Sequence, residues 1–262
     1  MAAKKKDGGF LSEYFEQSRR PIYSILASAP FFIAYQLGVT FLLPRQLPGN
    51  RFRNGAEMTL HELGMLLGNR HVAYILPVAI GMVLLYVLHR REMLKRELGG
   101  KTRKTSKGRK PLWGGFSVNC WLLMYLEGLI LALPLGLLSF QIPRLLNTGP
   151  SRFENVLFQL TTMCGAGAWE ELLFRLFLCT GLYYLGNKLL RLEKVPAGIL
   201  AAVISGVIFA FFHGFGSRPL DFYVFATIAG VYLAMICHFR SFGLAVAAHA
   251  IYDIFWVLTS LG

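Results

Sequence analysis

Two adjacent glutamates, Glu170 and Glu171, lie in an apolar run from Ala168 to Leu178, and Arg175 is the nearest positive charge. A carboxylate inside a bilayer costs about 3 kcal/mol even on insertion scales, so one at such a depth indicates a functional site. Residues four apart share a helix face, which pairs Glu171 with Arg175. Glu170 is then aimed elsewhere and is the freer general base for a water molecule. The alternative is a buried ion pair that joins helices.

Three more polar side chains interrupt apolar runs in the same half of the chain. His213 follows Phe209 by four residues, and Asp253 follows His249 by four, so each pair shares a helix face. His213 fits either a capping group at a helix end or a catalytic imidazole. His249 with Asp253 fits a packed pair, half of a transporter's proton relay, or part of an active site.

These residues must be held by membrane-spanning helices, because 55% of the 262 residues are hydrophobic and only 16% are charged. A spanning helix needs about 17 to 25 apolar residues. We predict an all-α, polytopic integral membrane helix bundle with about seven (six to eight) transmembrane helices. The predicted spans are Pro21 to Pro44, His71 to His89, Ser117 to Phe140, Val156 to Leu185, Pro196 to His213, Asp221 to His238 and Phe242 to Leu261.

The net charge of +13 is concentrated in the N-terminal arm and in the stretch from Arg90 to Lys110. The positive-inside rule places both in the cytoplasm, together with the connections Asn187 to Val195 and His238 to Ser241, and gives a cytoplasmic N-terminus. No aromatic residues alternate with the charges between Arg90 and Lys110. We therefore expect the lipid bilayer as a partner and no nucleic acid.

The predicted domains follow this division. Residues 1–20 form a cytoplasmic basic arm, 21–89 a two-helix membrane part, 90–112 a basic cytoplasmic linker and 113–262 the catalytic membrane domain, with the motifs in 153–261. All the candidate chemistry is expected in the last of these. Glu127 is a further acid within a span, and we expect it to line the same cavity or to pair with a basic group.

The three elements form an ordered set of Glu-Glu-x-x-x-Arg, Phe-x-x-x-His and His-x-x-x-Asp on three separate helices. This order, from about Phe153 to Leu261, resembles the CPBP group of intramembrane proteases. That group includes CAAX prenyl endoproteases and bacterial bacteriocin-processing and immunity proteins of the Abi type. The first 150 residues carry no such motif.

The resemblance implies a role for each matched residue. Glu170 would activate the attacking water, and His213 would help to hold it. Glu171 and Arg175 would support the site, while His249 and position 253 would stabilise the oxyanion of the tetrahedral intermediate. The chain departs from the prenyl endoproteases at Asp253, where they have asparagine. An ionised Asp253 cannot donate a hydrogen bond, so it would orient His249 or stay protonated.

Glu170, His213 and His249 also match the ligand types of a catalytic site for Zn²⁺ or another divalent metal. No His-Glu-x-x-His helix is present, so the usual spacing of zinc proteases gives no support. We favour a mechanism that requires no cofactor. Other nucleophiles, namely Ser205 beside His249, or Cys164 or Cys179 beside His213, would leave the buried glutamates unexplained.

The two histidines differ in their expected depth. His213 ends its span on the outer side, whereas His249 lies about two turns from the cytoplasmic turn, at about 1.5 Å per residue. Straight, level helices would hold them apart. Either the span from Pro196 to His213 starts shallow and tilts, or the stretch from Phe242 to Ala248 is a short broken segment.

The sequence therefore predicts an intramembrane endopeptidase that cuts a membrane-associated peptide or protein by glutamate-activated water. The expected location is the bacterial cytoplasmic membrane, because the basic chain carries no organelle address. The alternative is a non-enzymatic immunity or transport partner that keeps the same polar residues for binding.

Overall fold

The computed structural model describes residues 10–42, 54–66, 81, 83, 117–140, 156–213 and 218–260. Within these ranges the elements are helices and no strand occurs, which confirms the predicted all-α bundle. In chain order they are α1 (Phe10–Ser18), α2 (Pro21–Phe41), α3 (Gly55–Met65), α5 (Val118–Phe140), α7 (Val156–Gly165), η3 (Ala166–Glu170), η4 (Leu172–Cys179), α8 (Thr180–Lys188), α9 (Lys194–Phe212), α10 (Leu220–Phe239) and α11 (Phe242–Ser260).

Five of these helices, α2, α5, α9, α10 and α11, are long and apolar enough to cross a membrane. Each coincides with one of the predicted spans to within a few residues at either end. Many of their large apolar side chains are exposed, as expected for helices whose outer faces contact lipid rather than water. The predicted span from His71 to His89 lies, apart from residues 81 and 83, outside the described residues.

The predicted span from Val156 to Leu185 is helical throughout, but its middle is wider than an α-helix. Two π-helical stretches, η3 and η4, separate α7 from α8, and Glu171 lies between them. π-Helical turns are rare and occur often at functional sites. The acidic pair therefore lies where the backbone departs from regular α geometry.

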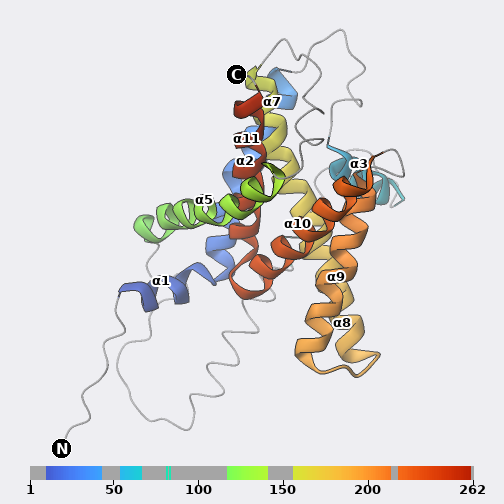
Figure 1. Ribbon diagram of the computed structural model, residues 1–262. Helices are drawn as coiled ribbons and strands as arrows, with labels where there is room; N and C mark the ends of the chain where they lie inside the picture. Colours follow the sequence, from blue (N-terminus) through green and yellow to red (C-terminus); the bar gives the residue numbers. More distant parts are fainter. Residues whose placement is uncertain are drawn as a thin grey trace, which may run out of the picture.

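The helices pack closely where small residues meet. Figure 1 shows α2, α7 and α11 running alongside one another, with α10 crossing between them and α9. At Gly167, an added Cβ would come within 2.6 Å of the Ala250 backbone nitrogen in α11. At Gly206 in α9, it would come within 2.9 Å of the Val231 nitrogen in α10. These glycines let neighbouring backbones approach to distances that no side chain would allow.

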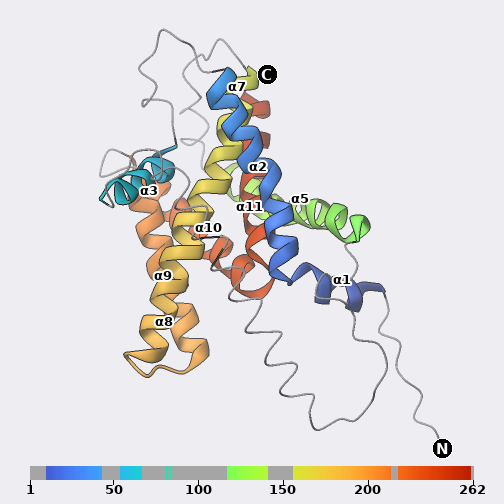
Figure 2. The same ribbon diagram turned by 180° about the vertical axis from the view of Figure 1, so that it is seen from behind.

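The two histidines reach a common level because α9 is shifted along its own axis relative to α11. In Figures 1 and 2 the α8–α9 hairpin extends well below the turn between α10 and α11, so the upper end of α9 is at the level of the middle of α11. The alternative of a broken segment from Phe242 to Ala248 is wrong, because α11 runs without interruption from Phe242 to Ser260.

Glu127 in α5 pairs with a basic group, one of the two roles expected for it. Arg240, in the turn between α10 and α11, donates from Nε to Oε1 and from Nη2 to Oε2 of Glu127, at 2.6 Å each. The Tyr14 hydroxyl of α1 donates to the same carboxylate. Burial, and then this contact with Glu127, raise the pKa of Tyr14, so its hydroxyl stays protonated and donates. This cluster attaches α1 to the bundle.

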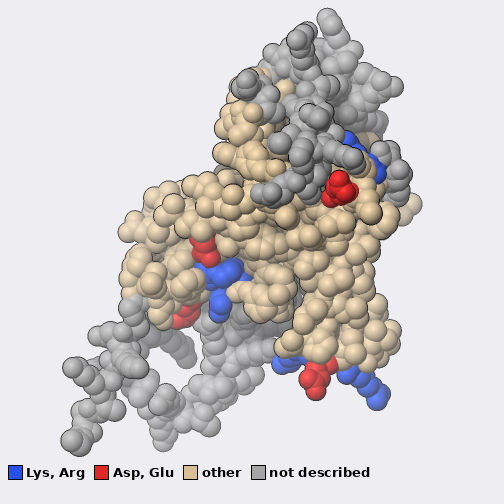
Figure 3. Space-filling view, viewed as in Figure 1, with Lys and Arg blue, Asp and Glu red and all other residues tan. Residues whose placement is uncertain are grey.

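The α8–α9 loop, the α10–α11 turn and α1 all lie towards the same end of the molecule (Figure 1). The loop between α8 and α9 and the helix ends beside it carry four exposed charged residues, Lys188, Arg191, Glu193 and Lys194. In Figure 3 charged side chains gather at this end, and the surface above them is mostly uncharged. The two described connections, Asn187 to Val195 and His238 to Ser241, therefore share one end of the fold, while Arg90 to Lys110 lies outside the described residues. The assignment of that end to the cytoplasm stays a prediction.

Candidate active site

Glu171 is fully buried and forms the pair predicted from its spacing. Its Oε2 lies 3.2 Å from Nε of Arg175, whose side chain is also fully buried. The Arg175 guanidinium lies over the Phe209 ring, 4.6 Å from the centroid, which adds a cation–π contact from α9. A buried arginine held in this way fixes the position of the π-helical segment against α9.

Glu170 points away from this pair, as predicted, but it is not without partners. Its Oε2 lies 3.1 Å from Nε2 of His213 and 3.8 Å from Nε2 of His249. Its Oε1 accepts a hydrogen bond of 2.9 Å from Nδ2 of Asn54. These partners could not be predicted, because helix geometry along one segment does not reveal groups supplied by other helices.

His213 directly follows the last residue of α9, and its ring rests on Phe209, with the centroids 4.4 Å apart. Its Nδ1 lies 2.8 Å from the Phe209 carbonyl oxygen, which can only accept, so Nδ1 carries a proton. A hydrogen bond between Nε2 and Glu170 then requires one more proton, on either the imidazole or the carboxyl group. The two residues therefore share a proton, which suits them to move one.

His249 lies in the middle of α11 between carboxylates. Its Nδ1 is 2.9 Å from Oε1 of Glu171, and its Nε2 is 3.5 Å from Oδ2 of Asp253 and 3.8 Å from Oε2 of Glu170. Glu171 thus contacts Arg175 with one oxygen and His249 with the other. The structure brings together all six residues that the sequence predicted for the site.

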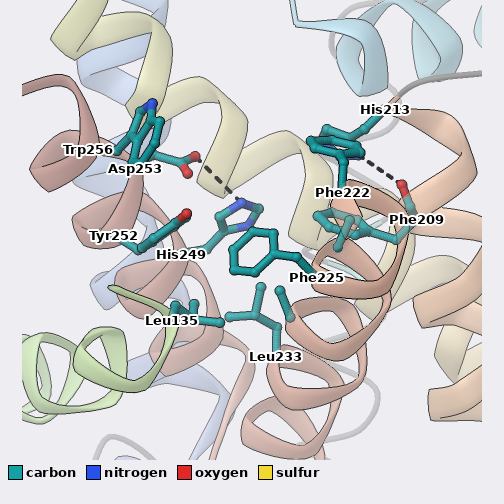
Figure 4. Close-up of a pocket in the computed structure, with 12 residues that line it drawn as sticks. Leu135, Phe209, His213, Phe222, Phe225, Leu233, His249, Tyr252, Asp253 and Trp256 are labelled. Carbon is teal, nitrogen blue, oxygen red and sulfur yellow. Dashed lines mark hydrogen bonds and ion pairs between the residues drawn. The ribbon is translucent and has the colours of Figure 1, made fainter. Parts of the chain in front are cut away.

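An apolar cavity of about 190 Å³ adjoins these groups. His213, His249 and Asp253 form its polar wall, and Figure 4 shows the two imidazoles facing the space between α9 and α11. The remaining wall is aromatic and aliphatic and comes from α5, α9, α10 and α11 (Leu135, Phe209, Phe222, Phe225, Ala226, Ala229, Leu233, Tyr252 and Trp256). Glu170 does not line this cavity, but it contacts both imidazoles that do.

The contact between Asn54 and Glu170 was not predicted from the sequence, since all the candidate chemistry was expected in the C-terminal half. Asn54 caps the N-terminus of α3, and Glu57 follows three residues later, a spacing typical of a helix start. That signal predicts a helix but not a contact with a glutamate 116 positions away.

The donor groups give little support to a metal site. Among the residues that the structure describes, no three His, Cys, Asp or Glu side chains are grouped so that they could hold a metal ion. Glu170 already receives hydrogen bonds on both oxygens, from Asn54 and from His213. The Ser205 alternative also lacks support, because its buried hydroxyl donates to the Phe174 carbonyl at 2.8 Å.

The fold and the site have the features of a membrane-embedded hydrolase, and comparison with protein families identifies the type. Residues 152–255 match the family described as type II CAAX prenyl endopeptidase, Rce1-like. This part of the chain is similar to the CPBP and CAAX protease group, in agreement with the resemblance drawn from the motifs. No curated protein and no solved structure gives a significant match. The five apolar helices and the family match support an integral membrane protein, and the family match supports an intramembrane endopeptidase.

Proposed function

We propose that the chain hydrolyses a peptide bond of a membrane-associated peptide or protein with a water molecule that Glu170 activates, without a metal. The observation that carries this proposal is the position of the Glu170 carboxylate. Its Oε2 lies beside two imidazole nitrogens, from His213 and His249, at the polar wall of an apolar cavity. Peptide hydrolysis needs a base, a positioned water and a donor to the developing oxyanion, and these three residues supply such groups.

In the proposed reaction, Glu170 and His213 bind the water, and Glu170 takes its proton as the oxygen attacks the substrate carbonyl. Nε2 of His249 donates to the resulting oxyanion, while Nδ1 of His249 donates to Glu171. The ring then carries a positive charge, which the nearby carboxylates of Glu171 and Asp253 stabilise. When the intermediate collapses, the carbon–nitrogen bond breaks and the proton on Glu170 passes to the leaving amine.

The cavity could bind an apolar side chain of the substrate next to the cleaved bond. A cavity of about 150 Å³ lined by apolar side chains holds benzene, and this one, at about 190 Å³, is somewhat larger. Its size suits a single large aliphatic or aromatic side chain of the substrate. Such a group is available in a peptide segment that is embedded in or delivered to the bilayer. We place the protein in the bacterial cytoplasmic membrane with its N-terminus in the cytoplasm.

Comparison of peptide and protein termini in cells tests the proposal. Cells carrying the wild type, Glu170→Gln or His249→Ala are compared by mass spectrometry of membrane-protein and secreted-peptide termini. We expect at least one wild-type terminus to fall by about 100-fold or more in both variants, because each removes a group used in the transition state. Glu193→Gln, an exposed substitution in the α8–α9 loop, is the control and should retain every terminus.

Unchanged termini in both variants, with a protective or transport phenotype still present, would mean that the polar residues serve a non-enzymatic partner protein instead. A separate measurement tests whether the reaction proceeds without a metal. Once a cleaved substrate is known, the purified protein is treated with 1,10-phenanthroline, and we expect the cleavage rate to stay the same. A loss that added Zn²⁺ restores would overturn the metal-free mechanism while leaving the peptidase activity in place.

A further inference from the structure

We infer that Asn54 is a positioning residue of the active site, supplied by the N-terminal part of the chain and acting through Glu170. The inference rests on the proposed function and extends the site beyond the matched residues 152–255. Asn54 does not line the cavity that His213, His249 and Asp253 share, so it acts on the base rather than on the substrate.

The orientation of the Asn54 amide follows from its hydrogen bonds. Its Oδ1 accepts from the backbone nitrogens of Ala56, at 2.8 Å, and Glu57, at 3.4 Å, which caps α3. Because the oxygen is occupied by backbone donors, the other side of the amide must be the nitrogen. Nδ2 therefore faces Glu170 and donates to its Oε1 at 2.9 Å.

Buried neighbours hold Asn54 in place. Its backbone nitrogen donates to the Tyr35 hydroxyl at 3.0 Å, and that hydroxyl donates to Oε2 of Glu57 at 2.5 Å. Tyr35 and Glu57 are almost completely buried, and Tyr35 comes from α2. The start of α3 is thus attached to a spanning helix. An amide fixed in this way can aim its donor without loss of side-chain freedom during the reaction.

The consequence for the chemistry concerns the two oxygens of Glu170. With Oε1 occupied by Asn54, Oε2 is the oxygen that lies beside His213 and His249. Without this donor the carboxylate can rotate, and either oxygen can face the imidazoles. Asn54 therefore selects the orientation in which one defined oxygen accepts the proton of the attacking water.

Two substitutions separate this role from the capping of α3. Aspartate and serine are helix caps as good as asparagine, so Asn54→Asp and Asn54→Ser both preserve the start of the helix. Neither can donate an amide hydrogen bond to Glu170, and Asn54→Asp adds a second negative charge beside it. Thr59→Ala is the matched control, since the Thr59 hydroxyl donates to the Gly55 carbonyl oxygen within α3, whereas the hydrogen bonds to Glu170 come from Asn54 and His213.

The first measurement needs no substrate. Dicyclohexylcarbodiimide is an apolar reagent that modifies protonated carboxyl groups, and mass spectrometry of the purified full chain gives the modified fraction of each glutamate. We expect modification of Glu170 to increase severalfold in both Asn54 variants and to stay at the wild-type level in Thr59→Ala. Glu127, paired with Arg240, is the internal reference. Wild-type modification of Glu170 in both Asn54 variants would overturn the inference.

The second measurement is the rate at which cells release the termini that depend on Glu170. We expect Asn54→Ser to lower this rate by about tenfold, the effect of losing one hydrogen bond to a charged group, and Asn54→Asp to lower it further. Full cleavage by both variants would likewise overturn the inference. If no terminus depends on Glu170 at all, the proposed function fails, and the carbodiimide measurement still decides whether Asn54 controls the Glu170 carboxyl group.

Discussion

Asp253 stands where the prenyl endoproteases have asparagine, and its surroundings indicate what the exchange means. Its Oδ2 lies 3.5 Å from Nε2 of His249, and both side chains reach the cavity. A carboxylate there stabilises a positive charge on His249, whereas an amide would donate directly to an oxyanion. In the proposed mechanism, the two residue types would therefore support the same intermediate in different ways.

We expect Asp253→Asn to retain cleavage within about tenfold of the wild type, because the new amide donor compensates for the lost charge near His249. The measurement is the release of Glu170-dependent termini, with Asp221→Asn, an exposed position on α10, as the control. A loss as complete as that of His249→Ala would show that position 253 acts only through its charge.

At the residue scale, contacts within one helix could be predicted from the sequence and contacts between helices could not. The spacing of four predicts the pairs Glu171–Arg175 and His249–Asp253, and both are present. The bond between Glu171 and His249 joins residues 78 positions apart. Such contacts depend on how the helices pack. Glu171 was expected to pair with Arg175, and in the structure it also forms a hydrogen bond with His249.

At the scale of elements, the contact between η3 and α11 sets the separation of the two acidic residues from His249. Gly167 lies against the backbone of Ala250, the neighbour of His249. This close approach brings Glu171 within hydrogen-bonding distance of the imidazole. Any side chain at position 167 would move the helices apart and lengthen that bond.

We expect Gly167→Ala to destabilise the protein by about 1 to 3 kcal/mol, because the added Cβ overlaps the Ala250 backbone. Thermal unfolding in detergent, together with the release of termini, measures both consequences. Gly181→Ala is the matched control, since nothing lies within 4 Å of an added Cβ there. It should leave stability unchanged or raise it slightly, because alanine favours a helix. Equal stability of both variants would contradict the role given to Gly167.

The positions of the helices along the chain followed from hydrophobic runs, since a bilayer requires long apolar helices. The positions of the helices relative to one another across the membrane could not be predicted in this way. The run from Pro196 to His213 indicates a helix, but hydropathy does not record where that helix packs against α10, at Gly206 and Gly230. The π-helical stretches around Glu170 and Glu171 could not be predicted either, because no residue type there marks a π-helical turn.

At the scale of the whole molecule, we expect the α8–α9 loop and the α10–α11 turn to face the cytoplasm together. Cysteines introduced at Arg191 and at Phe239, both exposed, should react with a membrane-impermeant maleimide only after the cells are opened. A cysteine at exposed Leu220, at the opposite end of α10, is the control and should react in intact cells. Labelling of either loop position in intact cells would reverse the predicted topology.

Because α11 is unbroken, its length from the first residue to His249 gives the distance that a substrate must cover from that end of the fold. His249 lies seven residues after the first residue of α11, or about 10 Å along the helix. An extended chain covers about 3.4 Å per residue. A peptide that arrives from the α10–α11 end would therefore need only about three unwound residues to bring a bond to the proposed catalytic groups. We expect the cleaved bonds to lie that close to the end of a membrane-embedded segment, and the remainder of that segment to stay helical while it is cut.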